Sequence, residues 1–269
     1  MIKVESPQMS YRKFVSQDGT IRLQFSEGFT TVFIPTKDEK WACCVSSQIG
    51  CPVGCSFCYT PKLKRNLTSE EIVMQFTIAR EVIGNLPTSV VFMGQGEPML
   101  NFRAVHSAIL QMNKLGLSFR HITLSTSGFY VDKLLDVPYH VALSLHSPFD
   151  AVRQKLMPVT KPIAELVAFA NAYSQKRKFG IMIEYALMKG VNDRDEDLVE
   201  LACMKWESNV FFNFIEFNNK GEFVKSERLE LFKETMRAKG YKAFIRPSRG
   251  ADIAAACGML DYIDSVREE

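Results

Sequence analysis

The cysteines of this chain are concentrated in one stretch, CCVSSQIGCPVGCSFCYT, which holds five of the seven. Cys51, Cys55 and Cys58 within it have the spacing C-x3-C-x2-C. Three closely spaced thiolates can bind three irons of a 4Fe-4S cluster, which leaves the fourth iron without a protein ligand. S-adenosylmethionine (SAM), a radical source in enzymes, can chelate such an iron through its amino and carboxylate groups. The alternative is zinc with Cys44 or Cys203 as fourth ligand, although the spacing departs from the paired C-x2-C ligands typical of zinc.

Composition and charge bound the class of protein. The chain has 269 residues, enough for one large α/β barrel or two modest domains. Its net charge of +3, from 33 basic and 30 acidic residues, neither requires nor excludes nucleic acid. The first residues lack the apolar run of a signal peptide, and no window approaches the roughly 18 apolar residues of a membrane span. We therefore expect a cytoplasmic protein without membrane contact, where clustered cysteines serve metals or catalysis more often than disulfides.

Hydrophobic periodicity predicts the elements that position these cysteines. Residues 11–35 alternate apolar and polar side chains around two hairpin-type turns, Asp18-Gly19 and Glu27-Gly28. After the cysteines, Thr68 and Glu71 form the capping box of a helix. Further helices are expected near 102–115, 162–176, 195–206 and 226–239, and strands near 89–98, 121–128, 139–146, 179–187, 209–217 and 241–247.

Strands that alternate with helices predict a parallel sheet whose ligand groups lie at the carboxyl ends of the strands. About six such units favour a partial (β/α)6 TIM-like barrel over a closed eightfold one. We expect one barrel domain over residues 41–269, preceded by a β-rich extension over residues 1–40. The candidate ligand-binding residues at the ends of four strands are Gly96, Glu97, Ser125, Ser144, Leu145, His146 and Asn218. His146 by itself is more typical of a structural hydrogen-bonding residue.

Seven motifs, taken in order, resemble a known family. They are CVSSQIGCPVGCSFC, NLTSEEIVMQ, VVFMGQGEPMLN, ITLSTSG, VALSLHSP, VND and RGADIAAACG. The cysteine spacing, with Phe57 before the last cysteine, resembles the radical SAM superfamily. The whole set covers nearly the entire chain and resembles the RlmN/Cfr-type radical SAM adenine methyltransferases. These enzymes methylate C2 of adenosine in ribosomal and transfer RNA, or C8 in the antibiotic-resistance members.

The resemblance implies a role for each candidate residue. The three spaced cysteines hold the cluster, and SAM contacts the strand ends, with Glu97 accepting a charge-assisted hydrogen bond from its ammonium group. Cys257 matches the family's methyl-carrying cysteine, and Cys44 matches its resolving cysteine. From its own surroundings, AAACGML, Cys257 is more typical of a small packing residue.

A radical route suits this chemistry because C2 and C8 of adenine are electron-poor carbons, not nucleophiles. As the resemblance implies, one SAM methylates Cys257, which must react as a thiolate. A second SAM is cleaved to a 5'-deoxyadenosyl radical that takes a hydrogen from the S-methyl group, and the methylene radical adds to adenine as an RNA–protein crosslink. Attack of Cys44 on Cys257 leaves a disulfide and releases methylated RNA. Two SAM are used per turnover, and a partner such as flavodoxin supplies electrons.

The chain departs from the family pattern at two places. Family members carry a small helical domain before the β-rich extension, and we expect this chain to lack it because the sequence begins close to that extension. The family's glutamate, a proton acceptor, aligns with Thr30, and threonine cannot act as a general base at neutral pH. Either that glutamate matters less than assumed, or another residue replaces it, or the activity is altered.

We expect a monomeric enzyme that acts on an unstacked adenosine of ribosomal or transfer RNA, with C2 preferred over C8. Three basic stretches are candidate RNA contacts, although each alone is more typical of a solvated face: KLKR, QKRK and RPSRG. Two alternatives stay open: a radical SAM enzyme of the same lineage with another substrate, and a non-enzymatic metal-binding RNA module. Cys44 and Cys257 argue against the module, because a structural metal site needs neither.

Overall fold

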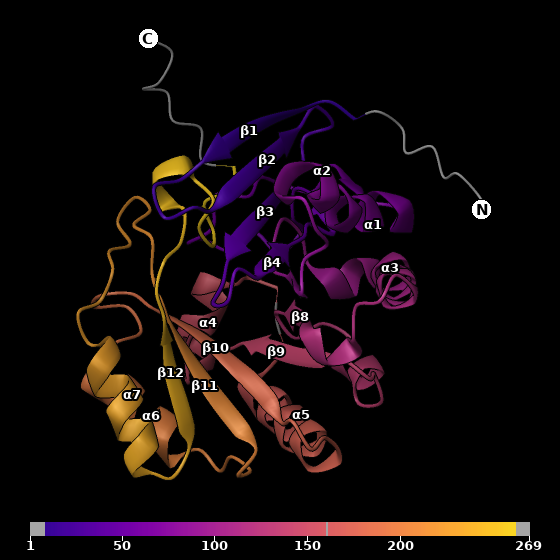
Figure 1. Cartoon of the computed structure of the whole chain (residues 1–269). Helices are drawn as coiled ribbons and strands as arrows, with labels where there is room; N and C mark the ends of the chain where they lie inside the picture. The colour runs from indigo at the N-terminus through magenta and orange to yellow at the C-terminus, as the bar shows by residue number, and fades with distance from the viewer. Residues whose placement is uncertain (1–8, 160, 262–269) are drawn as a thin grey trace.

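Ten strands form one sheet in the computed structural model, which describes residues 9–159 and 161–261 (Figure 1). The antiparallel part comprises β1 (Tyr11–Val15), β2 (Ile21–Phe25), β3 (Thr30–Pro35) and β4 (Trp41–Cys44). The parallel part continues with β7 (Ser89–Phe92), β8 (Ile122–Thr126), β9 (His140–Ser144), β10 (Ile181–Leu187), β11 (Val210–Glu216) and β12 (Lys242–Arg246). Because β4 pairs antiparallel with β3 and parallel with β7, the sheet is continuous across residue 40.

Helices cover the outside of the sheet (Figure 1). They are α1 (Ser69–Thr77), α2 (Ala79–Ile83), α3 (Phe102–Lys114), α4 (Asp150–Leu156), α5 (Ile163–Lys176), α6 (Asp195–Cys203) and α7 (Leu229–Ala238). The shorter elements are β5 (Gln48–Ile49), β6 (Arg65–Asn66) and the 3-10 helices η1 (Pro98–Asn101), η2 (Phe119–His121), η3 (Val131–Leu134) and η4 (Ala251–Ile253). Across residues 9–159 and 161–261, no helix is both long and apolar enough to cross a bilayer.

The fold confirms the predicted partial barrel. Each parallel strand from β4 to β11 is followed by helical structure, and β12 completes the sheet. Its order begins at β1 and ends at β12, and these two edge strands do not pair among the described residues, so the barrel is open. The predicted capping box is present, since the Thr68 hydroxyl accepts from the Glu71 amide at 3.2 Å and the Glu71 carboxylate accepts from the Thr68 amide at 2.8 Å.

The helix expected over 195–206 ends three residues early, at Cys203, and a second helix end differs for an identifiable reason. The helix expected from residue 226 begins at Leu229, because the Ser226 hydroxyl donates to Asp193 instead of opening the helix. The same hydroxyl accepts from the Arg228 amide at 3.0 Å, which holds residues 226–228 in a turn. A tertiary contact therefore decides where this helix starts.

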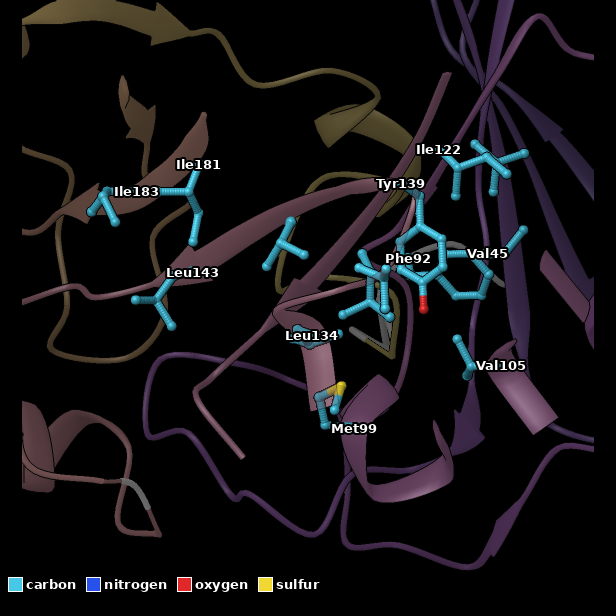
Figure 2. Close-up of a cluster of buried hydrophobic side chains, with 14 of the residues drawn as sticks. Val45, Phe92, Met99, Val105, Ile122, Leu134, Tyr139, Leu143, Ile181 and Ile183 are labelled. Carbon is cyan, nitrogen blue, oxygen red and sulfur yellow. The ribbon is translucent and has the colours of Figure 1, made fainter. Parts of the chain in front are cut away.

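A buried apolar layer between the sheet and its helices fixes the strands (Figure 2). The labelled side chains come from β7, β8, β9, β10, α3, η1 and η3 and from the residues just after β4 and just before β9: Val45, Phe92, Met99, Val105, Ile122, Leu134, Tyr139, Leu143, Ile181 and Ile183. Each is less than 9% exposed. Burial at about 25 cal/mol per Å² makes this layer the main source of stability, so groups at the strand ends rest on a fixed base.

Candidate active site

Two adjoining cavities lie at the open side of the barrel. The first is lined by the spaced cysteines and by most of the predicted strand-end residues: Cys51, Cys55, Cys58, Gly96, Glu97, Ser125, Ser144 and His146. The second contains Cys44 and is bordered by residues 34–37 and by the segment after β12. Glu184, Asn218, Arg246 and Cys257 are among the residues that line both cavities. Cys257 therefore stands at the border between them.

A short loop after β5 carries the three spaced cysteines. Gly50 opens it with a φ of +76°, and a Cβ there would lie 2.2 Å from the Lys62 carbonyl oxygen, so only glycine fits. The Cys51 amide donates to the Pro61 carbonyl at 2.8 Å. From the opposite side, the Lys220 ammonium donates to the Cys58 carbonyl at 2.6 Å and to the carbonyl two residues before it at 2.7 Å. The loop is thus held at both ends with its thiols facing the first cavity.

The electrostatics of these thiols fit an iron–sulfur cluster. Burial, with smaller contributions from the neighbouring Glu97 and Cys58, raises the pKa of Cys51 to about 12. Burial also raises the pKa of Cys55, again helped by the other two thiols. Bare thiolates would therefore be costly here, whereas bound cationic iron would offset their charge.

The same geometry argues against the zinc alternative. Among the residues that the structure describes, no three His, Cys, Asp or Glu side chains converge closely enough to share one metal ion. A cubane cluster has no such requirement, since each cysteine binds a different iron. Cys44 lines the second cavity and not the first, and Cys203 is exposed at the end of α6. Neither is placed as a fourth ligand beside the loop.

Glu97 lines the first cavity from the loop after β7, where it caps the start of η1. Its carboxylate is 3% exposed and accepts hydrogen bonds from the Thr126 hydroxyl at 2.7 Å, the Ser127 amide at 2.8 Å and the Met99 amide at 3.0 Å. Burial raises the pKa of this carboxyl, and the three donors oppose that rise. Gly96, with a φ of +100°, lets the strand end pass Gln48, whose Cβ would lie 2.6 Å from an added methyl group.

The ends of β8 and β9 place their polar groups around the same cavity, with one exception. Ser125 and Ser144 line it, but the Leu145 side chain is buried in the core, and this residue is not part of the lining. His146 has a φ of +57°, and its Nδ1 accepts from the Ala186 amide at 3.0 Å. Burial lowers the pKa of His146 to about 3, so its ring is neutral and serves as a fixed hydrogen-bonding group.

The second cavity brings together two cysteines that are more than two hundred residues apart in the sequence. Cys44 is buried at the end of β4, and burial raises its pKa to about 12, with Cys257 adding to the rise and Arg246 opposing it. The Arg246 guanidinium donates one hydrogen bond to the Cys257 sulfur and another to Glu184 at 3.5 Å. Asn218 donates to the Cys257 carbonyl at 3.3 Å.

Comparisons with known proteins agree with this geometry. The model of the radical SAM superfamily matches residues 45–202. A probable dual-specificity RNA methyltransferase RlmN from Thermosynechococcus vestitus is 38% identical over 96% of this chain and 81% of its own length. The RlmN of a Marinomonas species is 40% identical over 94% of this chain and 76% of its own. The chain belongs to the RlmN family of the radical SAM superfamily.

A solved structure supports the RlmN assignment. The crystal structure of a radical SAM methyltransferase from Sphaerobacter thermophilus superimposes with a TM-score of 0.86 at 36% identity, over 93% of this chain and 80% of that one. Radical SAM family membership implies a 4Fe-4S cluster and SAM as cofactors. In the chain described here, the cysteine loop of the first cavity has the donor set for the cluster, and the strand ends have polar groups for SAM.

Sequence reasoning missed several residues that shape the site. Arg246 was grouped with a basic stretch for RNA, RPSRG, yet its guanidinium faces Cys257 and Glu184. Its position at the carboxyl end of the last strand was the available signal. Arg153 is buried and donates to three carbonyls at the ends of β8 and β9: Ser127, Ser144 and Leu145. No sequence signal marked it.

The residue aligned with the glutamate of RlmN members lies away from both cavities. Thr30 is buried, and its carbonyl accepts from the Ser46 hydroxyl at 2.6 Å. It is absent from the lining of either cavity. Among the carboxylates that line both, Glu184 is 2% exposed and accepts from Asn213 at 3.1 Å. Burial raises the pKa of Glu184, while Arg246 opposes the rise.

Proposed function

We propose that this chain is a radical SAM RNA methyltransferase that methylates a carbon of an adenosine base, with C2 preferred over C8. Cys257 carries the methyl carbon and Cys44 resolves the crosslink. One observation carries the proposal: Cys257 lines both the cavity of the cysteine loop and the cavity of Cys44. A thiol that must meet SAM and later a second thiol needs this position.

Cys257 is the nucleophile of the first step. Its sulfur bonds to the methyl carbon while the bond from that carbon to the SAM sulfonium breaks, and the electron pair leaves on S-adenosylhomocysteine. The hydrogen bond from Arg246 balances negative charge on the sulfur. The backbone is held on both sides, by Asn218 at the Cys257 carbonyl and by the Tyr59 amide, which donates to the Gly258 carbonyl at 2.7 Å.

When bound by Cys51, Cys55 and Cys58, the cluster would supply, with a second SAM, the radical chemistry that joins the methyl carbon to the base in place of a ring hydrogen, which no protein side chain can supply. Cys44 then ends the reaction. Its sulfur attacks the Cys257 sulfur, an S–S bond forms, and the bond from Cys257 to the methylene carbon breaks. The electron pair stays on the carbon, which takes a proton and becomes the product methyl group. Two electrons from a donor such as flavodoxin reduce the disulfide.

RNA as the substrate rests on the names of the relatives, which are dual-specificity RNA methyltransferases. We extend this to ribosomal or transfer RNA, to two SAM per turnover and to a monomeric cytoplasmic enzyme. We also propose that residues 1–40 and 41–269 act as extension and barrel. Exposed basic groups at the border of the second cavity, Lys37 and Arg249, have the charge to contact phosphates.

Two cysteine variants test the proposal. The cluster-loaded enzyme, purified without oxygen, would be given total RNA from cells lacking its gene, and the nucleosides would be analysed by mass spectrometry. Wild type should form 2-methyladenosine. Cys44→Ala should accumulate RNA covalently attached at Cys257, whereas Cys257→Ala should give neither adduct nor product. Cys203→Ala, on α6, is the matched control and should behave as wild type. A Cys44→Ala enzyme with normal turnover would remove the resolving role.

A further inference from the structure

A row of paired residues crosses the antiparallel part of the sheet and ends at Cys44. In the register of β2, β3 and β4, Arg22 lies opposite Val32, and Val32 lies opposite Cys44. Directly opposed residues present their side chains on the same face. With neighbouring strands about 4.8 Å apart, the backbones of Arg22 and Cys44 are about 10 Å apart along this row.

The segment that carries Cys257 lies on this row. Figure 1 shows the chain after β12 returning beside β1 and β2. Val32 and Cys44 form one apolar cluster with Ala255 and Leu260, two residues before and three residues after Cys257. The resolving thiol is therefore part of the surface on which the methyl-carrying segment rests.

Arg22 holds this segment on both sides of Cys257. It is 6% exposed, and its guanidinium donates to the Ile253 carbonyl at 3.0 Å and to the Leu260 carbonyl at 3.0 Å. The planar fork of arginine can span two carbonyls in this way, while the single ammonium of lysine cannot reproduce both bonds in the same geometry. The eight-residue stretch from Ile253 to Leu260 is thereby closed into a loop with Cys257 inside it.

The turn between β1 and β2 adds a second attachment near the start of the segment. The Ser16 hydroxyl donates to the Asp252 carboxylate at 2.6 Å, and the Gln17 amide donates to the same carboxylate at 3.2 Å. The Gly250 amide donates to the Asp18 carboxylate at 3.1 Å. These contacts join the first hairpin of the chain to its last described segment.

We infer that Arg22 is a positioning residue for the Cys44–Cys257 step, and that the N-terminal hairpin serves as the anchor of the methyl-carrying segment. Cys44 is fixed in the sheet by strand pairing, and Arg22 fixes the Cys257 loop to the same row. The chance that the two sulfurs meet then depends on Arg22. The catalytic meaning of this contact rests on the function proposed above, but the geometry itself requires neither RNA nor SAM.

The thiol–disulfide equilibrium with glutathione measures this positioning directly. The two thiols and one oxidised glutathione give the Cys44–Cys257 disulfide and two reduced glutathiones, so two electrons and two protons pass to glutathione. The equilibrium constant reports the effective concentration of one sulfur near the other. It would be measured without oxygen on the cluster-loaded full chain, with the Cys44–Cys257 peptide pair quantified by mass spectrometry.

Arg22→Ala should lower this equilibrium constant by about tenfold or more, because the loop loses both attachments. Arg22→Lys should recover part of the loss, and it keeps the test usable if the alanine variant fails to fold. Arg12→Ala, an exposed arginine of β1 in the same hairpin, is the control and should leave the constant unchanged. The melting temperature of each variant would be recorded in parallel.

Three outcomes would overturn the inference or separate it from the proposed function. An Arg22→Ala constant equal to wild type, even with a lower melting temperature, would show a merely structural role. A wild-type protein that forms no Cys44–Cys257 disulfide would also overturn it. A wild type that forms the disulfide but never methylates RNA would instead refute the proposed function, and the Arg22 effect would still stand.

Discussion

The two cavities are built in opposite ways. The first takes its thiols from one loop of eight residues, Cys51 to Cys58, and closes it with the ends of successive parallel strands. The second places a sheet residue, Cys44, beside a segment from the other end of the chain, which the buried Arg22 and the partly exposed Arg246 hold through hydrogen bonds. A local loop can place a metal cofactor, whereas the proposed meeting of Cys44 and Cys257 depends on contacts between distant elements.

Removal of one cluster ligand should have the largest effect, and this effect should be confined to the first cavity. Cys58→Ala leaves two thiols for the cluster, so iron content should fall and cleavage of SAM to 5'-deoxyadenosine should drop about 100-fold or more. The glutathione equilibrium of Cys44 and Cys257 should change by less than about threefold, since strand pairing and Arg22 still position them. Cys203→Ala should alter neither measurement. A large loss in the glutathione equilibrium of Cys58→Ala would mean that the two cavities form a single unit.

The pH dependence of Cys44 should show that its cavity keeps this thiol protonated. Burial raises the pKa of Cys44 to about 12, so below that pH the thiol predominates and the reactive thiolate increases about tenfold per pH unit. Alkylation of Cys44 by iodoacetamide in Cys257→Ser, followed by peptide mass spectrometry, should rise with that slope from pH 7 to pH 9. A plateau in this range would contradict the predicted burial of the sulfur.

The smallest effect is expected in the helix that follows the cluster loop. Thr68→Ala removes the cap of α1 and should lower the free energy of unfolding by about 1 kcal/mol. Denaturant unfolding would measure this loss, with Ser69→Ala, the neighbouring exposed hydroxyl, as the control. Because the cap contacts neither cavity, SAM cleavage and the glutathione equilibrium should stay at wild-type values. A change in either would tie the two cavities to this helix.

The first cavity could be predicted from the sequence far better than the second. The partial barrel, the cysteine loop and most strand-end residues were predictable, because thiol spacing and hydrophobic periodicity are local properties. That the Leu145 side chain lies in the core could not be predicted, because the sequence does not tell which face each residue at a strand end takes. Cys44 and Cys257 were paired only through resemblance to a family.

The contacts of two buried arginines could not be predicted from the sequence. Arg22 and Arg153 bind main-chain carbonyls, and every residue has a carbonyl, so no residue type in the sequence marks their partners. Arg246 binds a sulfur brought near it only by the path of the chain after β12. Strand register and the path of the chain after β12 decide such contacts, and both are known only once the chain is folded.

The border position of Cys257 also limits how far its sulfur must move to reach either cavity. Rotation about the single Cα–Cβ bond of a cysteine moves its sulfur by at most about 3 Å. In the proposed cycle, a sulfur that lines both cavities could pass a one-carbon unit from one cavity to the other by this rotation alone, without a hinge or domain movement.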